Sequence, residues 1–267
     1  MKVAVIGAAG RMGGAVCEAL TGSSDLELVA AIDPAWAGGG EAGPDSKFPG
    51  VVVRSGDITR VAEAGAVVAV DFTVAGAALQ SAAWCAANGV HMVIGTTGIG
   101  DTGVARLSEL FPSDGALGCV IAANFAVGAV LMMRFAEMAS PWFDTAEIIE
   151  LHHDAKVDAP SGTAITTAER MAVASGEWGA DPTETEILRG ARGGRGPGGI
   201  RIHSVRMRGM VAHQEVILGA SGQTLTIRHD SIDRGSFMPG VLAAVRFVVS
   251  RPGVTVGLEP VLFGEAR

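Results

Sequence analysis

The sequence predicts an α/β protein of two domains, the first built on a parallel sheet and the second of the α+β class. The chain has 267 residues, of which 48% are hydrophobic, and this suffices for one large core or two smaller ones. Strands and helices alternate in the first half, which is typical of a parallel sheet. In the second half, runs of alternating apolar residues are separated only by short turns.

The first half begins with the apolar run Val3–Ile6, which predicts a buried strand, followed by a tight turn at Gly7–Gly13. The segment Ala35–Phe48 is rich in glycine, proline and acidic residues, so it predicts a loop. The other elements expected here are a helix at Met12–Leu20, strands at Leu26–Ile32, Val67–Phe72, His91–Ile94 and Gly118–Ala122, and helices at Ala77–Asn88 and Ala105–Phe111.

The pattern changes after Asn124. The last three alternating runs predict an antiparallel hairpin sheet, and the Gly/Arg-rich segment Arg189–Gly199 predicts a mobile loop. The final helix has a proline at its start and Arg251-Pro252-Gly253 as a stop signal. The elements expected are helices at Gly128–Ala139, Ser161–Ser175 and Pro239–Val249, and strands at Ala146–Leu151, Ile200–Met207, Met210–Leu218 and Thr224–His229.

Charge and composition argue against several classes of protein. The formal net charge of −8 disfavours sequence-independent nucleic-acid binding, which needs a basic face. The early first strand leaves no room for a signal peptide, and no apolar run approaches the roughly 20 residues of a membrane helix. Cys17, Cys85 and Cys119 lie in apolar stretches without CxxC spacing, as reduced core thiols do. We expect a soluble cytoplasmic protein with no nucleic-acid partner, no membrane partner and no metal site.

The turn Gly7–Gly13 spaces its glycines as GxxGxxG directly after the first strand. Glycines permit a tight turn, let the backbone approach a pyrophosphate and allow the helix to pack closely on the strand. The turn can be merely structural, but Asp33 follows about 20 residues beyond it, where a ribose-binding acid belongs. We therefore predict a Rossmann-like dinucleotide-binding domain. Its predicted cofactor contacts are Gly7, Ala8, Ala9, Gly10, Arg11, Met12 and Asp33.

The choice between NADH and NADPH stays open at this point. Asp33 is suited to hydrogen-bond a ribose 2′-hydroxyl and repels a 2′-phosphate, whereas Arg11 attracts that phosphate. We expect NADH, NADPH or both, with a preference for NADH.

Two further segments are predicted to contact the cofactor. Gly95-Thr96-Thr97-Gly98 follows a buried strand and is either an ordinary Gly/Thr loop or a cofactor contact at the carboxyl end of the sheet, and we favour the contact. Ala122-Ala123-Asn124-Phe125 lies at the domain junction as a hinge or an amide anchor for the nicotinamide. Asp71-Phe72-Thr73 ends a strand in the same way and carries less weight.

Residues 149–164 concentrate reactive side chains in one short span. A strand delivers His152 and His153 into a turn, Lys156 follows, and Asp158-Ala159-Pro160-Ser161-Gly162-Thr163 begins a helix. The N–H groups of a helix start attract anions, so a substrate carboxylate can bind there while Lys156 pairs with it and a histidine lies near the reacting centre. The predicted anion contacts at this helix start are Ser161, Gly162 and Thr163.

Each of these residues also has a structural interpretation. Consecutive residues of an extended segment point to opposite faces, so only one of the two histidines should enter the site. A histidine in a strand is as often a structural residue with its hydrogen bonds made inside the fold as it is a site residue. A lysine is usually solvated, and a serine before a helix is usually a cap. Their concentration favours one site over several unrelated explanations. The basic residues of the later strands are left outside it: Arg206, Arg208, His213, Arg228 and His229.

Over nearly its whole length the chain resembles the dihydrodipicolinate reductase family, and it looks like the actinobacterial members. The His152–Ala164 run is the most specific signal. The other matching segments are Gly7–Gly13, Asp71-Phe72-Thr73, Gly95-Thr96-Thr97-Gly98, Ala123-Asn124-Phe125, Val211-Ala212-His213-Gln214-Glu215 and Leu225-Thr226-Ile227-Arg228-His229-Asp230.

The resemblance implies hydride transfer from a nicotinamide to a cyclic dicarboxylate, with loss of water, in lysine and diaminopimelate biosynthesis. It implies that His152 is the catalytic acid/base and Lys156 the proton donor. It also implies that His153 contacts the substrate and that Gly162 and Thr163 bind a carboxylate. It also implies a homotetramer built by the second domain and a C-terminal segment that returns to the first. The domains are then residues 1–124 with 239–267, and residues 125–238.

Two departures from the family pattern affect affinity and cofactor choice. Asp154-Ala155 stands where many members carry basic residues, which makes the field around the substrate less positive. Pro34 follows Asp33 where members that favour NADPH often have a basic residue, which suggests dual or NADH preference.

Two alternative functions are considered. One is another two-domain dehydrogenase, which the His152–Thr163 motif disfavours. The other is a dinucleotide sensor without turnover, which would not need proton donors.

Overall fold

The computed structural model describes residues 1–36 and 53–264, and it divides into two compact units, Met1–Phe125 with Arg234–Arg267, and Ala126–Asp233. Most of the predicted loop Ala35–Phe48 therefore lies outside the described residues, and only Ala35 and Trp36 are seen, in a 3-10 turn. Within the described ranges, no helix combines the length and the apolarity needed to cross a bilayer.

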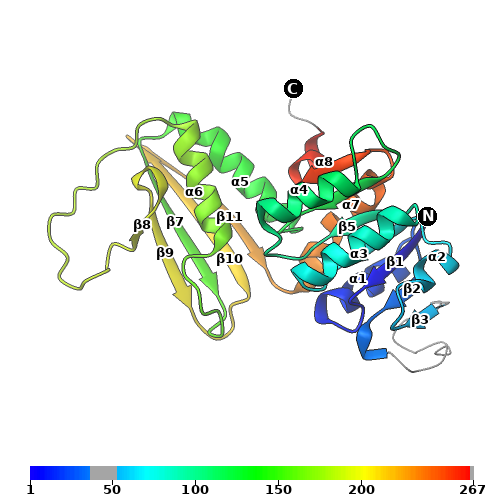
Figure 1. Ribbon diagram of the computed structural model, residues 1–267. Coiled ribbons are helices and arrows are strands. Elements are labelled where there is room, and N and C mark those ends of the chain that lie inside the picture. The colour runs from blue at the N-terminus through cyan, green and yellow to red at the C-terminus, as the bar shows by residue number, and fades with distance from the viewer. Residues whose placement is uncertain (37–52, 265–267) are drawn as a thin grey trace. The chain divides into compact units, whose positions relative to one another are not determined.

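The first unit is a seven-stranded sheet in which every neighbouring pair is parallel, in the order β12-β6-β5-β4-β1-β2-β3. Strands β1, β2, β3 and β5 of this sheet are labelled in Figure 1. Its strands are β1 (Lys2–Ile6), β2 (Glu27–Ile32), β3 (Val53–Ser55), β4 (Val68–Asp71), β5 (His91–Ile94), β6 (Gly118–Ile121) and β12 (Gly253–Val256). Its helices are α1 (Arg11–Thr21), α2 (Arg60–Glu63), α3 (Ala75–Ala87), α4 (Gly100–Leu110), α7 (Met238–Val248) and α8 (Glu259–Phe263), with 3-10 turns η1 (Pro34–Trp36) and η4 (Arg234–Phe237).

The strands of this sheet are nearly continuous apolar runs because helices cover both of its faces. Helices α2, α3 and α4 contribute Val61, Ala82 and Leu107 to one cluster with Ala4 and Ile6 of β1. Helices α1 and α7 pack against each other. The predicted parallel sheet is confirmed, but the sequence did not reveal two of its short strands, β3 and β12.

Strand order places the cofactor edge of this unit. Strand β1 pairs with β2 on one side and β4 on the other, so the connections leave β1 in opposite directions. In open parallel sheets, ligands bind outside the carboxyl ends of the strands at such a switch point. The glycine turn Gly7–Gly13 lies there, directly after β1.

The second unit is a five-stranded mixed sheet in the order β11-β10-β7-β9-β8 (Figure 1). Helices α5 and α6 pack together, and Met132 and Ala168 from them share a buried cluster with Ile148, Val216 and Leu218 of the sheet. The elements are α5 (Val127–Ala139), η2 (Ser140–Trp142), β7 (Thr145–His152), α6 (Gly162–Ala174), β8 (Gly194–Arg195), η3 (Pro197–Gly199), β9 (Arg201–Arg206), β10 (Ala212–Ala220) and β11 (Gln223–Ser231).

The prediction of a purely antiparallel hairpin sheet is wrong. Strands β10 and β11 do form a hairpin, but β9 is not the neighbour of β10; instead β7 lies between them and pairs with β9 in parallel. Strand β7 is central in the order of the sheet, and its Ile148 and Glu150 are completely buried. The predicted loop Arg189–Gly199 contains the short strand β8 and the turn η3.

Candidate active site

The glycine turn after β1 is shaped by contacts that exclude side chains. A Cβ on Gly13 would lie 2.0 Å from the Gly7 carbonyl oxygen, and one on Gly7, whose φ is +83°, would lie 3.0 Å from Thr73 Cγ2. Helix α1 begins after Gly10 without a side-chain cap and without an acidic residue in its first turn. A bare helix start behind a close backbone turn fits a pyrophosphate group, which needs backbone donors and space.

The carboxylate of Asp33 lies beside this turn. Its Oδ2 accepts from the backbone N–H of Ala9 at 3.0 Å, and its Oδ1 accepts from the N–H of Ala35 at 2.9 Å. The predicted ribose acid is therefore held against the glycine turn by the backbone, at the end of β2. This arrangement fits the adenosine side of a dinucleotide.

The other predicted cofactor segments meet at the same edge of the sheet. Gly95 faces the ring of Phe72, since a Cβ there would lie 2.1 Å from Phe72 Cε1, and the Phe72 ring packs against Phe125 with centroids 5.9 Å apart. Thr96 Oγ1 donates to the Thr73 carbonyl oxygen at 3.4 Å. Of the other residues predicted to contact the cofactor, Ala122 is buried, whereas Ala123 and Thr97 are exposed.

Asp71 anchors this edge from within the core. Its Oδ1 accepts from the backbone N–H of Thr73 at 2.8 Å and from its hydroxyl at 2.6 Å. Complete burial raises the pKa of Asp71, and the Thr73 bonds only partly oppose that rise. The carboxyl group thus fixes the turn against which Gly7 packs.

In the second unit, His152 is the last residue of β7 and is held by a carboxylate. Its Nδ1 lies 2.5 Å from Oε2 of Glu150, two residues earlier on the same face of the strand. Burial lowers the pKa of His152, and Lys156 and Arg206 lower it further, while Glu150 raises it; the net shift is downward. His152 is therefore a half-buried, mainly neutral imidazole at neutral pH, whereas His153 is exposed.

Lys156 lies in the loop after β7 with 21% of its side chain exposed. Its Nζ donates to both carboxylate oxygens of Asp158, at 2.7 and 2.8 Å. This pairing, above all the hydrogen bond from Lys156, holds the pKa of Asp158 below its ordinary value. The ammonium group is thus partly screened from water and balanced by an exposed carboxylate.

The start of α6 combines a cap with open space. Ser161 is buried, and its Oγ accepts from the backbone N–H of Ala164 at 3.3 Å, as a cap does. Gly162 has no atom within 4 Å of the position that a Cβ would take. No acidic side chain lies in the first turn of α6. An anion can therefore approach the backbone at Gly162 and Thr163.

Sequence reasoning missed two residues of this region. Glu150 was treated only as part of a strand, and Arg206 was set aside; in the structure Arg206 binds the Glu150 carboxylate with both of its terminal nitrogens, each at 2.8 Å. Arg206 therefore lies beside the candidate site, in contact with the carboxylate that holds His152. A charged residue two positions before a candidate histidine was the available signal, since strand residues i and i+2 share a face.

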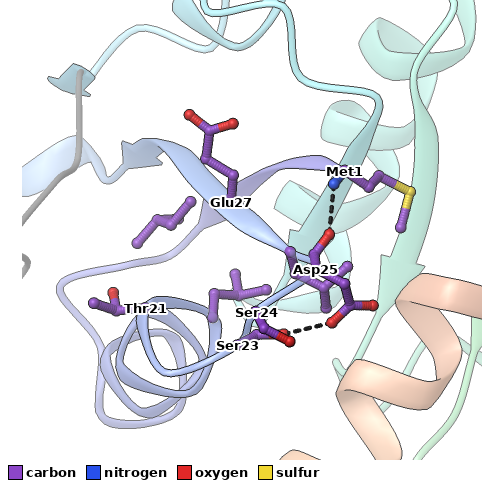
Figure 2. A pocket seen from close by; sticks show the side chains of 9 residues that line it. Met1, Thr21, Ser23, Ser24, Asp25 and Glu27 are labelled. Carbon is purple, nitrogen blue, oxygen red and sulfur yellow. Dashed lines mark hydrogen bonds between the residues drawn. The ribbon is translucent and has the colours of Figure 1, made fainter.

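A pocket of about 400 Å³ lies elsewhere in the first unit. Figure 2 shows the side chains that line it. Met1 donates from its terminal amine to the Asp25 carbonyl oxygen at 2.6 Å, and Ser23 donates to the Asp25 carboxylate at 2.8 Å. The pocket lies at the amino ends of β1 and β2, the sheet edge opposite to the glycine turn. None of the predicted site residues lines it.

Comparison with known proteins places the whole chain. The family model described as dihydrodipicolinate reductase, N-terminus, matches residues 1–125, and the model for the C-terminus matches residues 128–262. A protein of Cutibacterium acnes named 4-hydroxy-tetrahydrodipicolinate reductase is 48% identical over 98% of both chains, and a namesake from Corynebacterium aurimucosum is 46% identical over 98% of both. These relatives agree with the expected likeness to actinobacterial members.

Solved structures give the same result. A dipicolinate-bound dihydrodipicolinate reductase from Paenisporosarcina sp. TG-14 has a TM-score of 0.84 and 38% identity, covering 97% of this chain and 98% of that one. A scyllo-inositol dehydrogenase from Lactobacillus casei, at 14% identity and a TM-score of 0.61, shares the fold alone. With both halves matched in order and near-complete coverage, this chain belongs to the dihydrodipicolinate reductase family.

Proposed function

We propose that this chain reduces 4-hydroxy-tetrahydrodipicolinate to tetrahydrodipicolinate, with NADH or NADPH and with loss of water, in lysine and diaminopimelate biosynthesis. The observation that carries the proposal is one strand–loop–helix segment, from Glu150 to Thr163, that bears a held imidazole, a partly screened ammonium group and an open helix start. The names of the relatives support it, and so does the dipicolinate described for the matching structure.

The substrate is a dianion, so binding needs positive charge and backbone donors. The N–H groups of Gly162 and Thr163 at the start of α6 bind one carboxylate, and Ser161 shapes that turn as its cap. The ammonium of Lys156 attracts the same anion once it exchanges Asp158 for substrate. The exposed His153 adds a polar contact from the loop.

Proton transfer falls to His152 and Lys156. Because the pKa of His152 is lowered, chiefly by burial, its neutral imidazole dominates at neutral pH, which leaves Lys156 as the proton donor in the resting site. A bound dianion favours the charged imidazole, so His152 serves as acid/base during the removal of the substrate hydroxyl. A reduced nicotinamide, when bound, supplies the hydride.

The first unit holds the cofactor in this proposal. Residues Gly7 to Met12 receive the pyrophosphate at the start of α1, and Asp33 receives the ribose. The Gly95–Thr97 and Ala122–Phe125 segments, which meet at the same sheet edge, hold the nicotinamide. Asp33 and the following Pro34 favour NADH, while Arg11 leaves room for NADPH.

We also propose a cytoplasmic homotetramer built through the mixed sheet. Helices α5 and α6 cover one face, where Ile148 and Val216 are fully buried. Ile149 and Ile217 alternate with these residues, point to the other face and are half-buried. Apolar side chains on an uncovered sheet face are suited to contact between copies of the chain, which light scattering would measure as the mass in solution.

The test is to mix the purified protein with freshly generated 4-hydroxy-tetrahydrodipicolinate and to follow oxidation of NADH and of NADPH by absorbance. We expect substrate-dependent oxidation that is lost in Lys156→Ala. The matched control is Lys2→Ala, which removes an exposed lysine at the amino end of β1 and should keep full activity.

Each outcome has a distinct meaning. Oxidation in the wild type and in Lys2→Ala but not in Lys156→Ala supports both the reaction and the site. Cofactor binding without oxidation would overturn the reductase assignment in favour of another dehydrogenase or a dinucleotide sensor. Full activity in Lys156→Ala would remove Lys156 from the proton path.

A further inference from the structure

The carboxylate of Glu150 is fully buried and joins three elements of the second unit. Its Oε1 accepts from Arg206 Nη2 at 2.8 Å and from the backbone N–H of Ser161 at 3.2 Å. Its Oε2 accepts from Arg206 Nη1 at 2.8 Å and lies 2.5 Å from His152 Nδ1. One carboxylate thus contacts the proposed acid/base, the residue that caps α6 and a charged residue of β9.

Arg206 extends this link to the loop that carries Lys156. The guanidinium meets Glu150 with two parallel hydrogen bonds, and its Nη2 also donates to the Asp158 carbonyl oxygen at 2.7 Å. Such fork geometry fixes orientation as well as charge. The backbone of the loop is therefore tied to the same pair that holds His152.

We propose that Glu150 and Arg206 are a positioning pair for the proposed reaction. This pair sets the tautomer of His152 and holds the Lys156 loop and the start of α6 in place. This inference rests on the proposed function. Neither residue needs to touch substrate. An ionised carboxylate only accepts hydrogen bonds, so His152 must keep its proton on Nδ1 and present Nε2 as the reacting nitrogen.

The same strand offers a matched control. Glu147 pairs with Nε2 of His203 at 2.7 Å and with Arg192 at 2.7 Å, so it too is a carboxylate between an imidazole and a guanidinium. It differs in location: Glu147 is on the opposite face of β7 and 36% exposed, whereas Glu150 is completely buried. Glu147→Gln therefore makes the same chemical change away from the site. Because Glu147 lies on the sheet face proposed to join copies of the chain, the mass of this variant in solution is compared with that of the wild type.

Glu150→Gln has a specific expected effect on His152. The amide NH₂ of the glutamine can take the place of either carboxylate oxygen. In place of Oε1 it meets two donors, Arg206 Nη2 and the Ser161 N–H. In place of Oε2 it meets one donor, Arg206 Nη1, and the ring nitrogen of His152. The second orientation has fewer donor–donor conflicts. His152 Nδ1 then accepts a hydrogen bond, and the proton moves to Nε2.

The experiment records ring nitrogen NMR spectra of ¹⁵N-histidine protein without substrate, with the six histidines resolved and His152 assigned through His152→Asn. We expect the Nδ1–H form in the wild type and in Glu147→Gln, and the Nε2–H form in Glu150→Gln. In the activity assay, kcat of Glu150→Gln should fall about 10²-fold, within the usual contribution of acid–base groups, while Glu147→Gln keeps the wild-type kcat.

Glu150→Gln leaves the half-buried guanidinium of Arg206 without its carboxylate, so the double variant Glu150→Gln/Arg206→Met covers the case in which the single variant does not fold. Replacing a buried ion pair by neutral side chains of similar size is often tolerated. In the double variant, the amide oxygen of the new glutamine accepts from the Ser161 N–H and its NH₂ faces His152. The Nε2–H form of His152 is therefore expected again.

The pair is overturned if His152 keeps the Nδ1–H form in a folded variant without the carboxylate, or if the tautomer moves and kcat does not. Failure of the proposed function looks different, since the wild type would then oxidise no cofactor with this substrate. The tautomer spectra need no substrate and report on Glu150 in either case.

Discussion

At the residue scale, the proposed preference for NADH depends on the charge of Asp33. Its two oxygens accept from backbone N–H groups at Ala9 and Ala35, so its negative charge is fixed beside the glycine turn. A 2′-phosphate brought to this position meets that charge, whereas a 2′-hydroxyl can donate to it. The charge, more than the shape, therefore sets the expected preference for NADH.

We predict that Asp33→Asn shifts the ratio of kcat/KM for NADPH over NADH upward by about tenfold, which corresponds to about 1.4 kcal/mol. Steady-state kinetics with each cofactor measures this ratio. Asp114→Asn, the same change at an exposed position before β6, is the control and should leave the ratio unchanged. A constant ratio in Asp33→Asn would show that this carboxylate does not discriminate.

Glu150 also makes stability depend on pH. Burial alone raises its pKa, but hydrogen bonds from Arg206, Ser204 and His152 outweigh burial, and the pKa lies below its ordinary value. A carboxyl with a depressed pKa stabilises the fold above its unfolded pKa of about 4.3, and this stabilisation is lost as the pH falls through the folded pKa.

We predict that the free energy of unfolding of Glu150→Gln/Arg206→Met falls less than that of the wild type between about pH 6 and pH 3, because the variant has no carboxyl to protonate at this position. Urea unfolding at several pH values measures the difference. If the free energy of unfolding fell equally in the two proteins, the pKa of Glu150 would be the same in the folded and unfolded states.

At the scale of elements, the junction of β1 and α1 depends on glycine at one position and not at the next. A Cβ at Gly13 would lie 2.0 Å from the Gly7 carbonyl oxygen, whereas the nearest atom to one at Gly14 is the Ala8 oxygen at 3.8 Å. Of these two glycines of α1, only Gly13 is required for the close approach of the helix to the turn.

We predict that Gly13→Ala lowers the free energy of unfolding by about 1–3 kcal/mol through overpacking and abolishes cofactor binding. Gly14→Ala should raise it by about 0.5–1 kcal/mol, because alanine loses less backbone entropy in a helix, and should leave binding intact. Urea unfolding and cofactor titration test both. Equal effects of the two substitutions would contradict the role assigned to the Gly13 contact.

The local elements of the fold are predictable because their signals are short-range. The glycine turn, the parallel strands and the run from His152 to Thr163 are each contained in a few consecutive residues. The Glu150–Arg206 pair is not, since its members are 56 residues apart and meet only because β7 pairs with β9, with His152 opposite Arg206. Alternating apolar patterns specify strands but not neighbours, which is why β9 was assigned the wrong partner.

At the scale of the molecule, both ends of the chain build the first unit. Its core contains three buried thiols, Cys17, Cys85 and Cys119. Burial is the main cause that raises the pKa of Cys17 and of Cys85 to about 12, and it raises that of Cys119 as well. Thiolate, the reactive form, is therefore nearly absent at neutral pH, so thiol chemistry reports on the opening of this unit.

We predict that the native protein does not react with a thiol-specific reagent near pH 8, and that all three thiols react once urea unfolds the first unit. An absorbance assay that counts modified thiols measures this. Rapid modification of one thiol without denaturant would show that the surrounding core opens locally.

The C-terminal segment should be essential to that core. Val241, Val245 and Val248 of α7 are almost completely buried, and β12 pairs with β6 along the edge of the sheet. Burial of one valine contributes about 1.5–3 kcal/mol, so three together approach the 5–15 kcal/mol net stability of a typical domain. We predict that a chain ending at Asp233 exposes its thiols without denaturant and binds no cofactor. If its thiols stay protected, the residues before Phe125 form a stable sheet alone, and the returning segment contributes little to the stability of the fold.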